Sequence, residues 1–334
     1  MELTTVWFAL IAVLWAGYFL LEGFDFGVGM LLPVLARDDR ERRLLINTIG
    51  PVWDGNEVWL LVAGGATFAA FPEWYATLFS GFYLPLLIIL VALILRGLAF
   101  EYRGKGDSPQ WKRRWDLCII AGSLVPALLW GVAFGNIVRG VPINAQHEYV
   151  GTFFTLLNPY ALLGGLTTLS LFALHGAVFL ALKTDGEMRQ RAGRLAFRLS
   201  LPAVLIAAAF LVWTQLTHDD AWGWALSAAA AVALIGAVFA AKARREGWAF
   251  LATGATLVLA VAALFVTLFP DVMPTTLTGG DSLTVTNAAS TPYTLKVMTW
   301  VAVCFTPIVL GYQSWTYWVF RRRLRVEHIP ASHP

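Results

Sequence analysis

Long apolar stretches alternate with short polar connections along the whole chain. A helix rises about 1.5 Å per residue, so about 20 apolar residues cross a hydrocarbon core of roughly 30 Å. The pattern therefore predicts an all-α integral membrane protein. We expect about nine transmembrane helices, at Val6 to Leu35, Leu45 to Phe71, Tyr75 to Phe100, Asp116 to Val138, Pro159 to Leu182, Leu199 to Leu216, Gly223 to Ala241, Trp248 to Phe269 and Tyr293 to Phe320.

Basic residues concentrate in every second connection between these stretches. Lysine and arginine accumulate in short loops on the cytoplasmic side of a membrane. With nine spans, this distribution places the N-terminus outside and the C-terminus in the cytoplasm. The basic connections carry Arg37, Arg40, Arg42 and Arg43, then Arg103, Lys105, Lys112, Arg113 and Arg114, then Lys183, Arg189, Arg191, Arg194 and Arg198, then Lys242, Arg244 and Arg245, and finally Arg321, Arg322, Arg323 and Arg325.

Composition agrees with a membrane location. Of 334 residues, 58% are hydrophobic and 13% charged, and the mean hydropathy is +0.66, whereas ordinary soluble domains are about 25% charged. The net charge of +3 is divided among the loops, which argues against a nucleic-acid surface on one face.

The connections are short, which favours antiparallel neighbouring helices. We expect a first four-helix bundle within 1–138, a second within 159–270, a ninth helix at 293–320 and a cytoplasmic tail at 321–334. Small residues four apart, such as Gly23 and Gly27, let helices approach closely in lipid. They indicate either packing within this chain or an interface with a second membrane subunit.

Four acids lie inside apolar stretches, in the pairs Glu22 and Asp25 and Asp54 and Glu57. A carboxyl group at membrane depth costs roughly 2.5 kcal/mol or more, so such acids are functional candidates. The i, i+3 spacing places each pair on one helix face. One interpretation is a proton route, since acids in such surroundings can exchange protons near neutral pH. The other is an ion-pair lock, for example with Arg96.

Haem binding by this chain is not expected. Haem iron needs axial His, Met or Cys ligands at controlled depths, and His175 is the one histidine inside an expected span. We interpret His175 as a hydrogen-bonded packing residue. The sequence shows no P-loop, no dinucleotide-binding glycine fingerprint and no clustered Cys/His metal spacing, so no cofactor is expected in this chain.

Several segments together resemble subunit II of cytochrome bd-type quinol oxidases, namely GFDFGVGML, PVWDGNEVWL, GVAFGN and NPYALLGG. The resemblance extends from the first span to the ninth. It implies a haem-free subunit in the bacterial cytoplasmic membrane, paired with a subunit I that carries two b-type haems and haem d. The pair would oxidise quinol, reduce dioxygen to water and take the consumed protons from the cytoplasm.

The resemblance also implies roles for single residues. Asp54 matches the family's buried acid on the proton route, and Asp25 matches the acid of the family's first helix, which we assign to the same route. Trp59 matches a tryptophan beside a route by which oxygen can reach haem d. We assign Glu22 and Glu57 to the same proton route, because they lie beside these acids in the sequence. A structural quinone or lipid and small single-span accessory subunits also occur in the family.

A proton-coupled secondary transporter is the alternative function, because acids at depth and glycine-rich helices are expected there too. Transporter folds usually show repeats with broken helices in both halves. Here the buried acids occur in one half only, which argues against a transporter. A purely structural scaffold for another subunit differs from the oxidase interpretation only in whether the acids matter.

Overall fold

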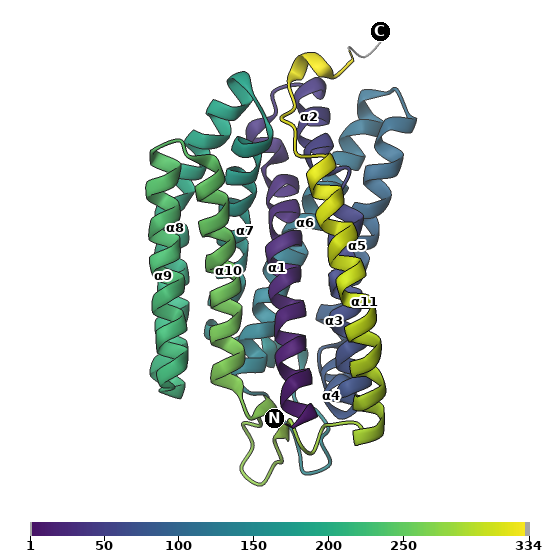
Figure 1. Ribbon diagram of the computed structural model, residues 1–334, viewed down its shortest axis with the longest axis vertical. Coiled ribbons are helices and arrows are strands. Elements are labelled where there is room, and N and C mark those ends of the chain that lie inside the picture. Colours follow the sequence, from purple (N-terminus) through teal and green to yellow (C-terminus); the bar gives the residue numbers. More distant parts are fainter. Residues whose placement is uncertain (1, 331–334) are drawn as a thin grey trace.

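The computed structural model describes residues 2–330 and is an elongated bundle of helices (Figure 1). A two-stranded antiparallel sheet, β1 (Asp271–Met273) and β2 (Leu283–Thr284), and three short 3-10 turns, η1 (Arg103–Lys105), η2 (Phe153–Leu156) and η3 (Val326–His328), complete it. The helices are α1 (Leu3–Leu35), α2 (Asp39–Ile49), α3 (Trp53–Ala70), α4 (Pro72–Gly81), α5 (Tyr83–Tyr102), α6 (Pro109–Arg139), α7 (Pro159–Lys183), α8 (Gly186–His218), α9 (Ala221–Lys242), α10 (Glu246–Leu268) and α11 (Pro292–Val319).

Eight helices within residues 2–330 are long and apolar enough to cross a membrane, namely α1, α5 to α10 and α11. The all-α membrane class is therefore confirmed, whereas the count of nine spans stays a prediction. The expected span 45–71 is interrupted between α2 and α3, where Pro51 lacks the N–H that a continuous helix would need. The remaining helix α3 has Asp54, Asn56 and Glu57 in its first turns, which lowers its apolar content.

Helix α1 lies at the centre and packs against α3, α6, α7 and α10. Its approach to α7 depends on glycine, since a Cβ added to Gly27 would lie 2.1 Å from the carbonyl oxygen of Phe172 and 2.7 Å from the Cα of Gly176. Gly23 likewise faces the ring of Phe172. Of the two interpretations of this glycine pair, packing within the chain is therefore correct.

The two ends of the bundle differ in character. Helices α1 and α11 both begin at the end that carries the connections 140–158 and 270–291 (Figure 1). These connections bond to each other, because Val141 N donates to Pro274 O at 3.0 Å and Thr276 N donates to Val141 O at 3.0 Å. The opposite end carries the arginine-rich connections. There the tail joins α7 through a 2.8 Å bond from Leu324 N to Lys183 O.

Helix α11 lies against the bundle with little of its surface covered, since Leu295 is its one buried residue. Trp7 of α1 anchors its first turns, with Nε1 donating to Leu295 O at 3.3 Å and to Thr299 Oγ1 at 3.1 Å. Large apolar side chains such as Trp300 and Ile308 remain 65% and 66% exposed. Helix α11 is therefore positioned mainly by polar contacts.

Candidate functional site

A buried ion-pair cluster joins α1, α3 and α5. Arg96 of α5 and Glu22 of α1 are both 0% exposed, and Arg96 Nη1 contacts a carboxylate oxygen of Glu22. The same nitrogen lies 3.3 Å from Glu57 Oε1 of α3. The guanidinium also lies over the ring of Phe26, 4.7 Å from its centroid, where a cation is attracted by the ring electrons. Glu22 and Glu57 thus both pair with Arg96, as in the ion-pair lock considered from the sequence.

Asp25 belongs to a different set of contacts. Its carboxylate accepts a 2.6 Å hydrogen bond from the side-chain amide of Asn56, and both residues are 0% exposed. The oxygen of that amide accepts from Tyr317 OH at 2.8 Å and from Gln313 Nε2 at 3.4 Å. Among the described residues, no cation donates a hydrogen bond to Asp25. Asp25 is therefore a buried acid whose direct partner is neutral.

Asp54 lies apart from both sets. It is exposed, and its one side-chain hydrogen bond within residues 2–330 is accepted from the N–H of Gly55 at 2.8 Å. Asp54 stands in the first turn of α3, directly after the break at Pro51, with its side chain exposed. In the isolated chain, the four acids are therefore divided into an ion-paired set, a neutral-bonded acid and an exposed acid.

Trp59 connects α3 to α11. Its Nε1 donates to Gln313 Oε1 at 2.9 Å, and its ring lies against Gly17, where an added Cβ would stand 2.1 Å away. Gln313 and Tyr317 were not among the candidate residues predicted from the sequence. The available signal was polar side chains four residues apart within an otherwise apolar helix, the same criterion that selected the acids.

Hydrogen-bonding capacity remains at the centre of the cluster. Buried polar atoms are usually hydrogen-bonded, yet several atoms here have no protein partner among the described residues: Glu22 Oε2, Asp25 Oδ1, Arg96 Nε and Nη2, and Tyr18 OH. They belong to α1 and α5, the two helices joined by the contact between Arg96 and Glu22. Such groups can bind water or exchange hydrogen-bond partners.

His175 is fully buried, and both of its ring nitrogens have hydrogen-bond partners. Nδ1 lies 2.7 Å from Thr253 Oγ1 and Nε2 lies 3.1 Å from Leu20 O, while the ring stacks on Phe250. This confirms the interpretation of His175 as a packing residue. Within the described part of the chain, no group of three or more His, Cys, Asp or Glu side chains is arranged to hold a metal ion.

Comparisons with known proteins all indicate the same family. A family model described as cytochrome bd terminal oxidase subunit II matches residues 3–320. The chain is 44% identical over 332 residues to cytochrome bd ubiquinol oxidase subunit 2 of Bacillus subtilis (strain 168), covering 97% of each protein. It is 38% identical over 365 residues to cytochrome bd-I ubiquinol oxidase subunit 2 of Escherichia coli (strain K12), covering 98% of this chain and 96% of that protein.

A similar fold occurs in a solved structure of bd oxidase from Geobacillus thermodenitrificans. The TM-score is 0.80 at 18% sequence identity, over 96% of this chain and 99% of that chain. At that identity the likeness concerns the fold alone. The family model, which matches nearly the whole length, and the two relatives show that this chain belongs to the cytochrome bd terminal oxidase subunit II family, and so to the subunits of an oxidoreductase complex.

Proposed function

We propose that the chain is the haem-free subunit II of a quinol oxidase in the bacterial cytoplasmic membrane. A haem-bearing subunit I, with two b-type haems and haem d, would oxidise quinol and reduce dioxygen to water. The names of the relatives support this, because both are ubiquinol oxidase subunits designated 2. His175 also fits a haem-free chain, since both of its ring nitrogens already have partners.

We further propose that this chain helps to deliver cytoplasmic protons. The surroundings of Asp25 are the main support for this proposal. Reduction of dioxygen to water consumes protons, and a route through the membrane needs groups that bind and release them. Asp25 is fully buried and hydrogen-bonded to the neutral amide of Asn56, and no cation among the described residues donates a hydrogen bond to it. Glu22 lies one helical turn away on α1, paired with Arg96.

Within this proposal the other acids have separate tasks. Arg96 holds Glu22 and Glu57 in one cluster and fixes α1, α3 and α5 relative to each other. Asp54 would be the entry acid, covered by subunit I when the complex assembles, because it is exposed in the chain alone. The proton route and the ion-pair lock then coexist in different residues.

We also propose a route for dioxygen beside Trp59. Dioxygen is apolar and would follow apolar surface, and α3 presents the exposed side chains Val58, Leu61 and Val62 near Trp59.

We further propose that the helices on either side of the 140–158 connection form two four-helix bundles. The complex would also hold a structural quinone or lipid and accessory single-span subunits.

Purification of the native complex through this chain tests the proposal. Absorption by haem d and b-type haems is expected in the preparation, and a colourless preparation would favour the transporter instead. Asp25→Asn keeps the size and most of the hydrogen bonding but removes the titratable group. Turnover per haem d should fall at least about tenfold in Asp25→Asn, and it should remain unchanged in Asp107→Asn, an exposed acid in a cytoplasmic connection.

A further inference from the structure

A basic pocket lies at the cytoplasmic end of α8, where this helix faces the turn between α9 and α10. Its volume is about 540 Å³, and its lining includes Arg194 and Arg198 of α8 together with Lys242 and Arg244 of the turn. None of these four cations forms an ion pair with another residue in 2–330. The pocket therefore presents positive charge that the protein itself does not neutralise.

The acids in the same pocket are already engaged. Asp185 pairs with Arg325 at 2.7 Å, and Glu246 pairs with Arg189 at 2.8 Å and lies 3.7 Å from Arg323. They cannot neutralise the four free cations as well. Arginine binds phosphate through paired N–H donors, and lysine acts as a point charge. The chemistry of the pocket thus suits a phosphate-bearing anion at the membrane surface.

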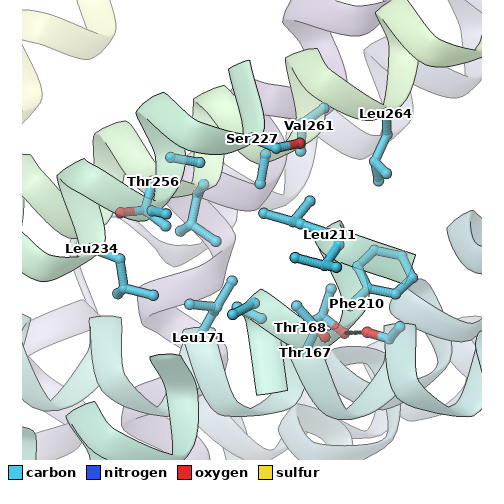
Figure 2. A pocket seen from close by; sticks show the side chains of 18 of the residues that line it. Thr167, Thr168, Leu171, Phe210, Leu211, Ser227, Leu234, Thr256, Val261 and Leu264 are labelled. Atoms are coloured by element: carbon cyan, nitrogen blue, oxygen red, sulfur yellow. Dashed lines mark hydrogen bonds between the residues drawn. The ribbon is translucent and has the colours of Figure 1, made fainter. Parts of the chain in front are cut away.

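An apolar cavity of about 280 Å³ lies deeper in the same group of helices. Figure 2 shows Leu171, Leu211, Leu234, Val261 and Leu264 around it. The threonine hydroxyls in the lining donate to backbone carbonyls, Thr167 to Leu163 O at 2.8 Å, Thr168 to Ala127 O at 2.6 Å and Thr256 to Ala252 O at 2.9 Å. Ser227 Oγ is the buried hydroxyl of the lining without a partner among the described residues. The cavity therefore suits a hydrocarbon rather than a polar ligand.

The cavity opens toward lipid between α8 and α9. Its lining includes exposed residues on both helices, Ala208 and Val212 on α8 and Ala231 and Ile235 on α9. The basic pocket lies over the same helix pair. At about 1.5 Å per residue, six residues from Arg198 to Val204 and seven from Lys242 to Ile235 separate the pocket from the cavity by roughly 10 Å on each helix. That separation suits the glycerol region and the upper part of one chain of a lipid.

We propose that an anionic phospholipid binds between α8 and α9 as a structural component. Its phosphate is held by Arg194, Arg198, Lys242 and Arg244, and one acyl chain enters the apolar cavity. A quinone would fill the cavity but would leave the cations without a partner, because it carries no phosphate. The inference is independent of the role proposed for Asp25.

Native mass spectrometry of the purified oxidase complex, with analysis of the extracted lipids, tests this inference. The wild type should retain phosphatidylglycerol or cardiolipin after extensive detergent washing. The double variant Arg194→Gln/Arg198→Gln should retain at least tenfold less, and so should Ala231→Phe, which blocks the mouth of the cavity. The matched controls are Arg113→Gln/Arg114→Gln, exposed on the same membrane side, and Ala229→Phe, exposed on α9 outside the cavity lining.

Two results would overturn the proposal. Equal lipid loss in the variants and their controls would show only general attraction to a basic membrane face. Retention of a quinone or a zwitterionic lipid alone would show that the cations do not select the ligand. As an independent readout, phosphatidylglycerol added to the delipidated complex should raise its melting temperature, because a ligand that binds the native state stabilises it. Phosphatidylcholine should not, and Arg194→Gln/Arg198→Gln should abolish the difference.

Discussion

Asp25 of α1 and Asn56 of α3 are joined by a 2.6 Å hydrogen bond between two side chains with no exposure. The oxygen of the same Asn56 amide accepts a 2.8 Å hydrogen bond from the hydroxyl of Tyr317, which lies on α11. One asparagine side chain therefore connects an acid at the centre of the chain to its last helix. The proposed proton acid and the position of α11 depend on the same residue.

Asn56→Leu should destabilise the protein and weaken the attachment of α11. The change leaves Asp25 and Tyr317 without their shared partner, and each buried polar group that loses its bond costs about 1–3 kcal/mol. Thermal unfolding of the complex should shift to lower temperature, and protease accessibility of the 270–291 connection should rise. Asn47→Leu is the control, because Asn47 is exposed. Equal shifts in both variants would contradict the connecting role.

Arg96→Leu should prevent normal assembly. Removing one member of a buried ion pair leaves an uncompensated charge and costs about 3–5 kcal/mol, here on Glu22. The double variant Arg96→Leu/Glu22→Leu removes both charges and should recover part of the loss. The yield of haem d complex recovered through this chain measures both. A single variant as abundant as the double would show that the ion pair is not needed for the fold.

Two glycine substitutions should have opposite effects on stability. Gly27→Ala places a methyl group 2.1 Å from Phe172 O and must push α1 and α7 apart. Gly64→Ala meets no atom within 4 Å, and alanine in a helix interior is favoured over glycine by about 0.5–1 kcal/mol. Melting temperatures of the two variants should therefore lie on either side of the wild type. A neutral Gly27→Ala would contradict the close approach of these helices.

The contribution of Asp39 to stability should depend on pH. Burial by itself would raise the pKa of this carboxyl group, but Arg103 at 2.7 Å and Lys112 at 3.4 Å outweigh burial and hold the pKa below its usual value. A group with a lowered folded-state pKa stabilises above its unfolded pKa of about 3.9, and this stabilisation is lost as pH falls through the folded pKa. Asp39→Asn should melt below the wild type at pH 7.

The difference between Asp39→Asn and the wild type should vanish in acid, once the pH has fallen below the folded-state pKa of Asp39. Asp107→Asn should match the wild type throughout, because Asp107 is an exposed acid in the neighbouring connection. A difference that persists unchanged in acid would mean that the side chain acts through packing and not through its charge.

Asp54→Asn should separate stability from turnover. Asp54 is exposed in this chain, so the variant should fold, bind subunit I and retain haem d as the wild type does. If Asp54 supplies protons, turnover per haem d should fall at least about tenfold, equivalent to roughly 1.4 kcal/mol in the barrier. Normal turnover in a normally assembled complex would remove Asp54 from the proposed route.

Hydrophobic pattern and charge distribution were sufficient to predict the helical class, most span positions and the candidate acids. The break at Pro51 was visible in the sequence, yet the surrounding apolar run suggested one continuous helix. Spacing could also place Asp54 and Glu57 on one face, but it could not show whether a neighbouring helix covers that face. That requires knowing how helices pack, which is a tertiary property.

The contribution of α11 to the site was harder to predict for a related reason. Gln313 lies 257 residues from Asn56, and the bond between their side chains depends on the path of the whole chain. Single polar residues in an apolar span are ambiguous, since they can bond to their own backbone as Thr316 does to Tyr312 O. The acids were easier to select, because an ionisable group at membrane depth has fewer structural explanations.

The sparse packing of α11 determines how freely its sequence can change. A helix with one buried residue and three polar anchoring side chains encodes its position in Leu295, Thr299, Gln313 and Tyr317. The other apolar positions need only to remain compatible with hydrocarbon or with a neighbouring subunit. Random exchange of Phe305, Ile308 and Trp315 among Leu, Ile, Val and Phe should therefore be tolerated, while a library at the anchoring positions should retain few active members.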